Sequence, residues 1–186
     1  MKCAALFLAA AIGMAVLPAR VNAEPPQSVT GLWLNPDQGW IVEYAACPGG
    51  MCGTLVSFRK GNAPENAPRD QQNPDRTLRN TPLCGLRVVG GLTPSRQGDG
   101  KWEGGWIYDP QTGGTYRALV EQVGADTVKV RGYLLTPVLG RTVTLERVSG
   151  AIERCRVPVE EAVSRPAAIL PDSLANYDPA DSNRKR

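Results

Sequence analysis

The sequence predicts an all-β protein, built as a single antiparallel up-and-down β-barrel of about eight strands. Short apolar segments alternate with turn residues, and the chain holds 20 glycines and 16 prolines. Several segments also alternate apolar and polar side chains: Val128 and Val130 fall on one face, Lys129 and Arg131 on the other. This period of two is typical of a sheet with one buried face. Closure into a barrel removes exposed strand edges, which favours it over the alternative, a two-sheet sandwich.

The first 23 residues follow the pattern of a secretory signal peptide. Lys2 precedes an uncharged run, Ala4–Leu17, and Val21 and Ala23 place small residues before a cleavage site. We therefore expect cleavage after Ala23 and a periplasmic or secreted protein. An uncleaved membrane anchor is the alternative, but a spanning helix needs about 20 apolar residues. No later segment is apolar enough to span a bilayer as a helix.

Residues 24–149 form the predicted barrel domain. Turn residues divide it into eight expected strands, at Val29–Leu34, Trp40–Ala46, Thr54–Arg59, Gly85–Leu92, Lys101–Tyr108, Thr115–Val123, Thr127–Leu135 and Arg141–Val148. Gly113-Gly114 and Gly124-Ala125 mark two of the hairpin turns. A barrel of this size has an interior just wide enough for side chains or for one small ligand.

A long loop rich in proline and asparagine, residues 61–82, interrupts the rhythm of strands. Within it, Asn73 predicts a helix N-cap, Pro74 the first helical position and Asp75 an acid in the first turn. This helical turn is expected to end near Arg79. Connections longer than about 15 residues are uncommon in compact domains and are often functional.

The cysteines of the chain after the signal peptide predict disulfide bonds. Four remain, an even number in an oxidising compartment: Cys47, Cys52, Cys84 and Cys155. The first two flank a Pro-Gly-Gly turn, so we expect them to pair, which leaves Cys84 for Cys155. A four-thiolate zinc site is the alternative, but it usually needs two short cysteine spacings, and only one is present. The second bond would tie the proline-rich extension, residues 150–186, to the barrel, and beyond Ser173 we expect disorder.

Composition excludes several classes of function. The chain has no histidine, so it has neither a Ser-His-Asp triad nor an imidazole metal ligand. Its formal net charge is +3, too small to indicate a nucleic-acid partner. No cofactor motif is present. The sequence therefore leaves carboxylates as the main candidates for chemistry.

Acidic residues gather at two places, and turn formation explains both. Asp70, Asn73 and Asp75 offer oxygen ligands, but they do not follow the calcium-loop pattern, so we expect no metal site. Asp109 and Glu103 could form an acid–base pair. However, Asp109 precedes Pro110, which is ordinary turn chemistry, so we expect no catalytic set.

A glycine-tryptophan motif and a late arginine suggest how the barrel is closed. Gly31-Leu32-Trp33 opens the first expected strand, and Arg147 lies near the end of the last. The first and last strands of a closed barrel are neighbours, so this arginine can stack on the indole and cap the floor. The combination resembles the lipocalin and calycin group of ligand-binding barrels.

A longer resemblance extends from Gly31 to Arg147. It rests on several motifs: Gly31-x-Trp33, Cys47 with Met51-Cys52-Gly53, Asp70-x-x-Asn73-Pro74-Asp75, Leu78-Arg79, Pro82-Leu83-x-Gly85-Leu86, Gly104 to Pro110 with Gly113 and Thr115-Tyr116, Arg131-Gly132-Tyr133, and Gly140-Arg141-Thr142. In these motifs the chain resembles the bacterial family of secreted proteins called domain of unknown function 2147. The resemblance implies a small lipocalin-like barrel in the periplasm, without a settled activity. The family pattern has lysine at Gly114 and tryptophan at Leu145, so roles of those side chains do not carry over.

Three functional hypotheses follow. The first is a barrel that binds a small apolar or amphipathic molecule, with the long loop at its opening fixed by Asp70 and Arg79. Inward-facing aromatic rings would line that pocket, namely Trp106, Tyr108, Tyr116 and Tyr133. The second is a non-enzymatic accessory protein whose loop or tail docks on an envelope partner. The third is an enzyme that uses Asp70, Asp75, Glu103 or Asp109 on an envelope polymer.

Overall fold

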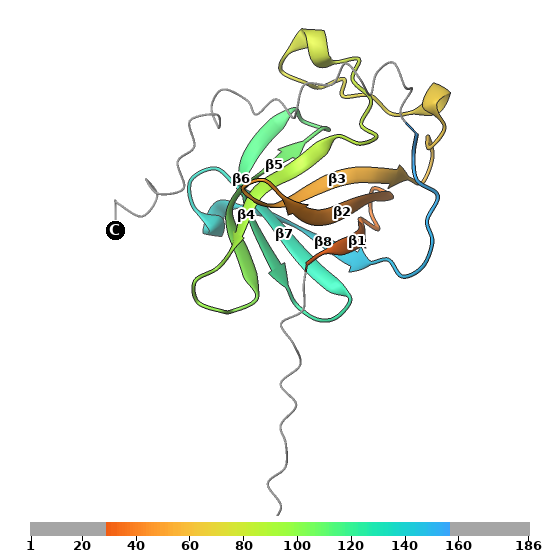
Figure 1. Ribbon diagram of the computed structural model, residues 1–186. Helices are drawn as coiled ribbons and strands as arrows, with labels where there is room; N and C mark the ends of the chain where they lie inside the picture. Colours follow the sequence, from red (N-terminus) through yellow and green to blue (C-terminus); the bar gives the residue numbers. More distant parts are fainter. Residues whose placement is uncertain (1–28, 157–186) are drawn as a thin grey trace, which may run out of the picture.

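Eight antiparallel strands close into a barrel in the order of the sequence (Figure 1). The strands of this computed structural model are β1 (Gly31–Leu34), β2 (Trp40–Cys47), β3 (Gly50–Phe58), β4 (Arg87–Pro94), β5 (Lys101–Asp109), β6 (Gly114–Gln122), β7 (Thr127–Tyr133) and β8 (Arg141–Arg147). Three 3-10 turns join them: η1 (Pro64–Asn66), η2 (Arg76–Leu78) and η3 (Pro137–Leu139). The structure describes residues 29–156. The predicted signal peptide and the expected disorder beyond Ser173 lie outside these residues.

The fold class and the number of strands are as predicted, and most strand ends agree within two residues. The largest difference is β3, which begins at Gly50 rather than Thr54. Cys47 pairs directly with Gly50, so β2 and β3 continue to the tip of their hairpin. A disulfide between Cys47 and Cys52 crosses this tip, with 5.9 Å between the Cα atoms.

The strand order gives the barrel two distinct ends. Sequential antiparallel strands place the β2–β3, β4–β5 and β6–β7 connections at one end, which we call the floor. The β1–β2, β3–β4, β5–β6 and β7–β8 connections lie at the other end, which we call the mouth. The long loop joins β3 to β4 and therefore lies at the mouth, at the top of Figure 1.

Large side chains seal the barrel near the floor. Alternate residues of each strand point inward, as the period of two predicts. The fully buried ones include Trp33, Val120, Val128 and Leu145. Leu145 lies opposite Val128 across the β7–β8 pair. The position at which the family pattern has tryptophan is thus a core position in this chain.

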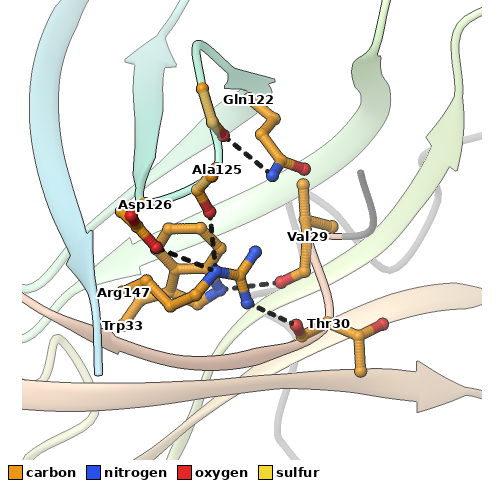
Figure 2. A network of polar contacts seen from close by, with 8 residues as sticks. Val29, Thr30, Trp33, Gln122, Ala125, Asp126 and Arg147 are labelled. Atoms are coloured by element: carbon orange, nitrogen blue, oxygen red, sulfur yellow. Dashed lines mark hydrogen bonds and ion pairs between the residues drawn. The ribbon is translucent and has the colours of Figure 1, made fainter. Parts of the chain in front are cut away.

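Trp33 and Arg147 cap the floor as predicted, and Figure 2 shows the contacts that hold them. The guanidinium carbon of Arg147 lies 4.1 Å from the centroid of the indole ring. The indole Nε1 donates to the carbonyl of Val29 at 2.8 Å. The guanidinium of Arg147 also donates to the carbonyls of Ala125 at 2.7 Å and Thr30 at 3.3 Å. One arginine therefore joins the start of β1, the β6–β7 turn and the end of β8.

Gly31 is required by this arrangement. Its φ is +124°, a conformation that side chains disfavour. A Cβ atom there would also lie 3.1 Å from Nη1 of Arg147. The spacing of glycine and tryptophan in the motif thus follows from the packing of the arginine over the indole.

The start of the C-terminal extension is fastened to the outside of the barrel. Cys155 forms the predicted disulfide with Cys84, with 5.9 Å between the Cα atoms. Its backbone amide donates to the carbonyl of Val56 at 2.8 Å. Arg154 forms a two-pronged ion pair with Glu43, with N–O distances of 2.7 and 2.9 Å. These hydrogen bonds lower the pKa of the Glu43 carboxyl. Residues 153–155 therefore contact β2 and β3.

Candidate functional site

A buried carboxylate holds the long loop against the barrel. Asp70 is only 1% exposed, although it lies in a loop. Its Oδ1 accepts a hydrogen bond from the hydroxyl of Tyr108 on β5 at 2.7 Å, and its Oδ2 accepts one from Nδ2 of Asn73 at 2.7 Å. Its backbone amide donates to the carbonyl of Thr81 at 2.9 Å. Since a buried carboxylate is costly without such partners, these bonds fix the loop in one position.

The helical turn in the loop begins later than predicted. Asp75, and not Asn73, is the N-cap of η2, and its Oδ1 accepts from the backbone amide of Thr77 at 2.9 Å. Together with the Thr77 hydroxyl, this bond lowers the pKa of Asp75. The prediction that Asn73 caps the turn and that Pro74 occupies its first position was wrong. The amide group of Asn73 is used for Asp70 and for an Asx turn to Asp75, at 2.9 Å.

The side chain of Arg79 supports the same loop by binding the loop backbone. Its Nε donates to the carbonyl of Asn73 at 2.8 Å. This hydrogen bond joins the residue after η2 to the residue two positions before Asp75, as expected for an arginine that fixes the loop. The structure places Arg79 and Asp70 in the loop scaffold, and a contact with a ligand stays a prediction.

The turn between β5 and β6 interlocks with the long loop. Asp109 builds this turn: its Oδ1 accepts from the amide of Gln111 at 3.0 Å, and its carbonyl accepts from the amide of Gly113 at 2.8 Å. Gly113 has a φ of +71°, and a Cβ atom there would collide with the carbonyl oxygen of Gln72. The loop backbone therefore lies directly on the glycine. Two motifs of the family pattern, far apart in sequence, form one unit at the mouth.

Removal of the Tyr108 hydroxyl tests this unit. Burial and the hydrogen bond to Asp70 raise the pKa of Tyr108, so it donates as a neutral phenol. In Tyr108→Phe the buried carboxylate loses one donor, and we expect the free energy of unfolding to fall by about 1–3 kcal/mol. We also expect trypsin to cleave faster after Arg76 and Arg79. Urea titration and timed proteolysis measure both effects, and Tyr116→Phe is the matched control. Equal behaviour of the two variants would contradict the role of the bond.

Three of the four aromatic residues expected inside the barrel lie on its outer face. Trp106 pairs with Arg117, and Arg117 pairs with Tyr133, so these three side chains share a face. Ala118, next to Arg117 on β6, points to the opposite face and is fully buried in the core. The face of Arg117 is therefore the outer one. Tyr108 lies two residues from Trp106 and shares its outer face, beneath the long loop. The prediction that these rings line the interior was wrong.

A β-bulge is the physical reason for the error in β5. The register of β5 against β6 shifts between Trp102 and Gly105. Trp102 pairs with Val120, a core residue, so an uninterrupted alternation would also place Trp106 inside. The bulge reverses the alternation beyond it. The indole ring of Trp106 consequently covers Gly90 from outside, where a Cβ atom would lie 2.7 Å from the ring.

Three inward-facing residues toward the mouth are only partly buried, although Val89 and Val130 in the same ladders are buried. Ile107 and Tyr116 face each other across β5 and β6, and Val143 lies opposite the core residue Val130. Each of the three retains exposure to solvent. The Tyr116 ring runs along the inner wall, and its hydroxyl lies 2.5 Å from the position of a Cβ atom on Gly114. We call Ile107, Tyr116 and Val143 the mouth lining. Of these three residues, only Tyr116 was predicted to face inward. The bulge in β5 concealed the inward direction of Ile107.

The acidic residues do not form a catalytic pair. Glu103 and Asp109 lie six residues apart on β5, which separates them by about 20 Å along the strand. Asp70 and Asp109 are occupied in the loop and in the turn. Within residues 29–156, no cluster of three or more histidine, cysteine, aspartate or glutamate side chains could hold a metal ion. No helix in this part of the chain is long and apolar enough to cross a membrane.

Known proteins resemble the chain in sequence and in fold. The family described as "Uncharacterized protein conserved in bacteria (DUF2147)" matches residues 31–147, which is more than half of the chain. HP1028 from Helicobacter pylori, described as belonging to the lipocalin family, has a similar fold. The TM-score is 0.58 at 21% sequence identity, over 74% of this chain and 97% of that one. No curated protein matches the chain. The chain belongs to the DUF2147 family, with a lipocalin-like barrel closed by Trp33 and Arg147.

Proposed function

We propose that this protein binds one small apolar or amphipathic molecule at the mouth of its barrel. One observation carries the proposal: three inward-facing side chains toward the mouth keep exposure to solvent, although buried core residues lie next to them in the sheet. Trp33, Val120 and Val128 near the floor are 0% exposed, whereas the mouth lining is partly open to solvent. An apolar surface that stays open at one end of a rigid barrel is typical of a ligand site.

The chemistry of the mouth lining fits an amphipathic ligand. Ile107 and Val143 offer aliphatic surface, and Tyr116 offers an aromatic ring with one hydroxyl. An apolar chain would lie against these residues, and its polar end would remain at the rim near the long loop. Because Asp70 and Gly113 hold that loop in place, the rim is preorganised, which lowers the entropic cost of binding.

We further propose that the protein works outside the cytoplasm after removal of residues 1–23. Both disulfides favour an oxidising compartment, and the leader pattern favours secretion. Under this proposal the barrel carries or sequesters its ligand in the periplasm without chemical change. Carboxylates that serve turns and loop anchoring support a role without catalysis.

An environment-sensitive apolar dye, or a fatty acid that competes with it, tests the proposal. We expect saturable binding to the folded protein, and Tyr116→Ala should weaken it about fivefold by removing ring contacts from the mouth. Tyr133→Ala is the matched control, because it removes the same ring from the outer face of the neighbouring strand. Far-ultraviolet circular dichroism verifies the fold of both variants. Absence of saturable binding, or equal effects of the two variants, would contradict the proposal.

A further inference from the structure

The connection between β7 and β8 exposes aliphatic side chains to solvent at the mouth. Leu134, Leu135, Val138 and Leu139 are 68%, 81%, 84% and 80% exposed. We call these four residues the apolar tip. Val123, in the floor hairpin between β6 and β7, is 44% exposed and stands alone. Scattered apolar residues are common on protein surfaces, but four in six consecutive positions indicate a surface that meets another apolar phase.

The backbone of the tip is arranged to tolerate an apolar surrounding. Its 3-10 turn satisfies the amides of Leu139 and Gly140, which donate to the carbonyls of Thr136 and Pro137 at 3.2 and 3.1 Å. Arg131 on β7 donates to the carbonyls of Pro137 and Val138, the latter at 2.9 Å. Unsatisfied backbone groups are what makes loops costly in lipid, and this loop satisfies several of them internally.

Arg131 also makes the tip rigid. Its Nη1 donates to the hydroxyl of Thr142 on β8 at 2.6 Å, so one guanidinium ties the loop to both of its strands. Pro137 restricts the backbone at the start of η3. The four aliphatic side chains are therefore displayed in a fixed arrangement and do not collapse onto the barrel.

The charged residues that flank the tip in sequence are basic. Arg131 and Arg141 flank the tip in sequence, whereas Lys129 lies near the floor and pairs with Glu121 on β6. Arg141 begins β8 directly after the tip and is exposed. An aliphatic end with cations at its base is complementary to a bilayer that has anionic headgroups, because the aliphatic groups enter the acyl boundary and the cations remain with the headgroups.

We propose that the apolar tip docks the protein on an anionic lipid surface, with the barrel mouth facing the bilayer. This proposal is independent of ligand binding in the barrel, since it depends on the outside of the β7–β8 connection. A second copy of the chain is the competing occupant. Arg131 and Arg141 disfavour it, because a symmetric contact between two tips would bring these arginines together.

Vesicle co-sedimentation tests the proposal with the chain from Glu24 to Arg186. Vesicles of phosphatidylethanolamine with phosphatidylglycerol are compared with vesicles of phosphatidylcholine alone. We expect binding to the anionic vesicles, and the double substitution Leu135→Ser, Val138→Ser should weaken it at least about tenfold. Arg141→Gln should weaken it about fivefold on the anionic vesicles only. Val123→Ser is the matched control and should leave binding unchanged.

Three outcomes would overturn the proposal. The first is failure of the unchanged protein to sediment with anionic vesicles, and the second is equal binding by the double variant. The third is a dimer in sedimentation velocity that the double variant abolishes, without vesicle binding, since the tip would then be an interface between copies. Because both substituted side chains are exposed, the variants should fold, and an unchanged thermal midpoint verifies this. Dye binding measured on the same variants separates failure of docking from failure of the ligand site.

Discussion

Replacement of Cys84 and Cys155 by serine will lower the free energy of unfolding by about 4 kcal/mol. The two residues are 71 positions apart, so the bond removes a large loop from the conformations of the unfolded chain. The same replacement should also loosen the segment around Cys155 from β3, where its amide donates to the Val56 carbonyl. Urea titration with tyrosine and tryptophan fluorescence measures the change.

The second disulfide supplies the control for this experiment. Cys47 and Cys52 are separated by only 5 positions, so the loop-entropy relation gives about 2 kcal/mol for their replacement. We therefore expect replacement of Cys84 and Cys155 to cost about twice as much stability as replacement of Cys47 and Cys52. A larger loss from the short loop, or no loss from the long one, would contradict the tethering role of the Cys84–Cys155 bond.

Truncation of the floor should have an effect of similar size. Trp33 is 0% exposed, and Trp33→Ala should cost about 3–5 kcal/mol through a cavity and the lost contact of the indole with Val29. Arg147→Ala should cost about 1–3 kcal/mol, because the guanidinium contacts the indole and the Ala125 carbonyl.

A double-mutant cycle isolates the contact between the two floor residues. With the ring and guanidinium 4.1 Å apart, the double variant should lose less stability than the sum of the single variants. The expected coupling is about 0.5–2 kcal/mol. Strictly additive losses would show that the Arg147 guanidinium stabilises the floor only through its hydrogen bonds to the carbonyls of Ala125 and Thr30.

Sequence patterns predicted those parts of the fold that depend on residues close together in the sequence. Alternation of side chains predicted Val128 and Val130 as inward residues of β7, and both are buried. Closure of the barrel was expected to make the first and last strands neighbours, and the predicted stacking of Arg147 on Trp33 is found there. Short cysteine spacing likewise determined the Cys47–Cys52 pair, which left the other two cysteines for each other.

Two features could not be predicted because they depend on contacts between distant segments. The first is the direction of Trp106: Gly104-Gly105 is typical of a bulge, and one is found there, but the pair does not show that the alternation reverses beyond it. In the long loop, the Asn73 side chain had two possible uses, as a helix cap or as a partner for Asp70. The hydrogen bond from Tyr108, 38 positions away, places Asp70 in a buried site, and Asn73 then completes that site.

The candidate site, too, was predictable only where nearby residues determine it. The sequence located the mouth, since the longest loop connects two strands at that end. Its lining was predicted in part: Tyr116 faces inward as its alternation with Ala118 indicates. Ile107 was not recognised because the bulge reverses the alternation before it. Val143 was not recognised because a single aliphatic residue in a strand carries no signal that separates a ligand wall from a packed core.

Methyl-group nuclear magnetic resonance during a fatty-acid titration tests the central claim most directly. Binding at the mouth predicts saturable chemical-shift changes for the methyl groups of Ile107 and Val143. The methyl groups of Val120 and Val128, sealed near the floor, should keep their shifts. Unchanged shifts at Ile107 and Val143 under saturating fatty acid, or changes restricted to exposed Leu135 and Val138, would contradict a ligand site inside the barrel.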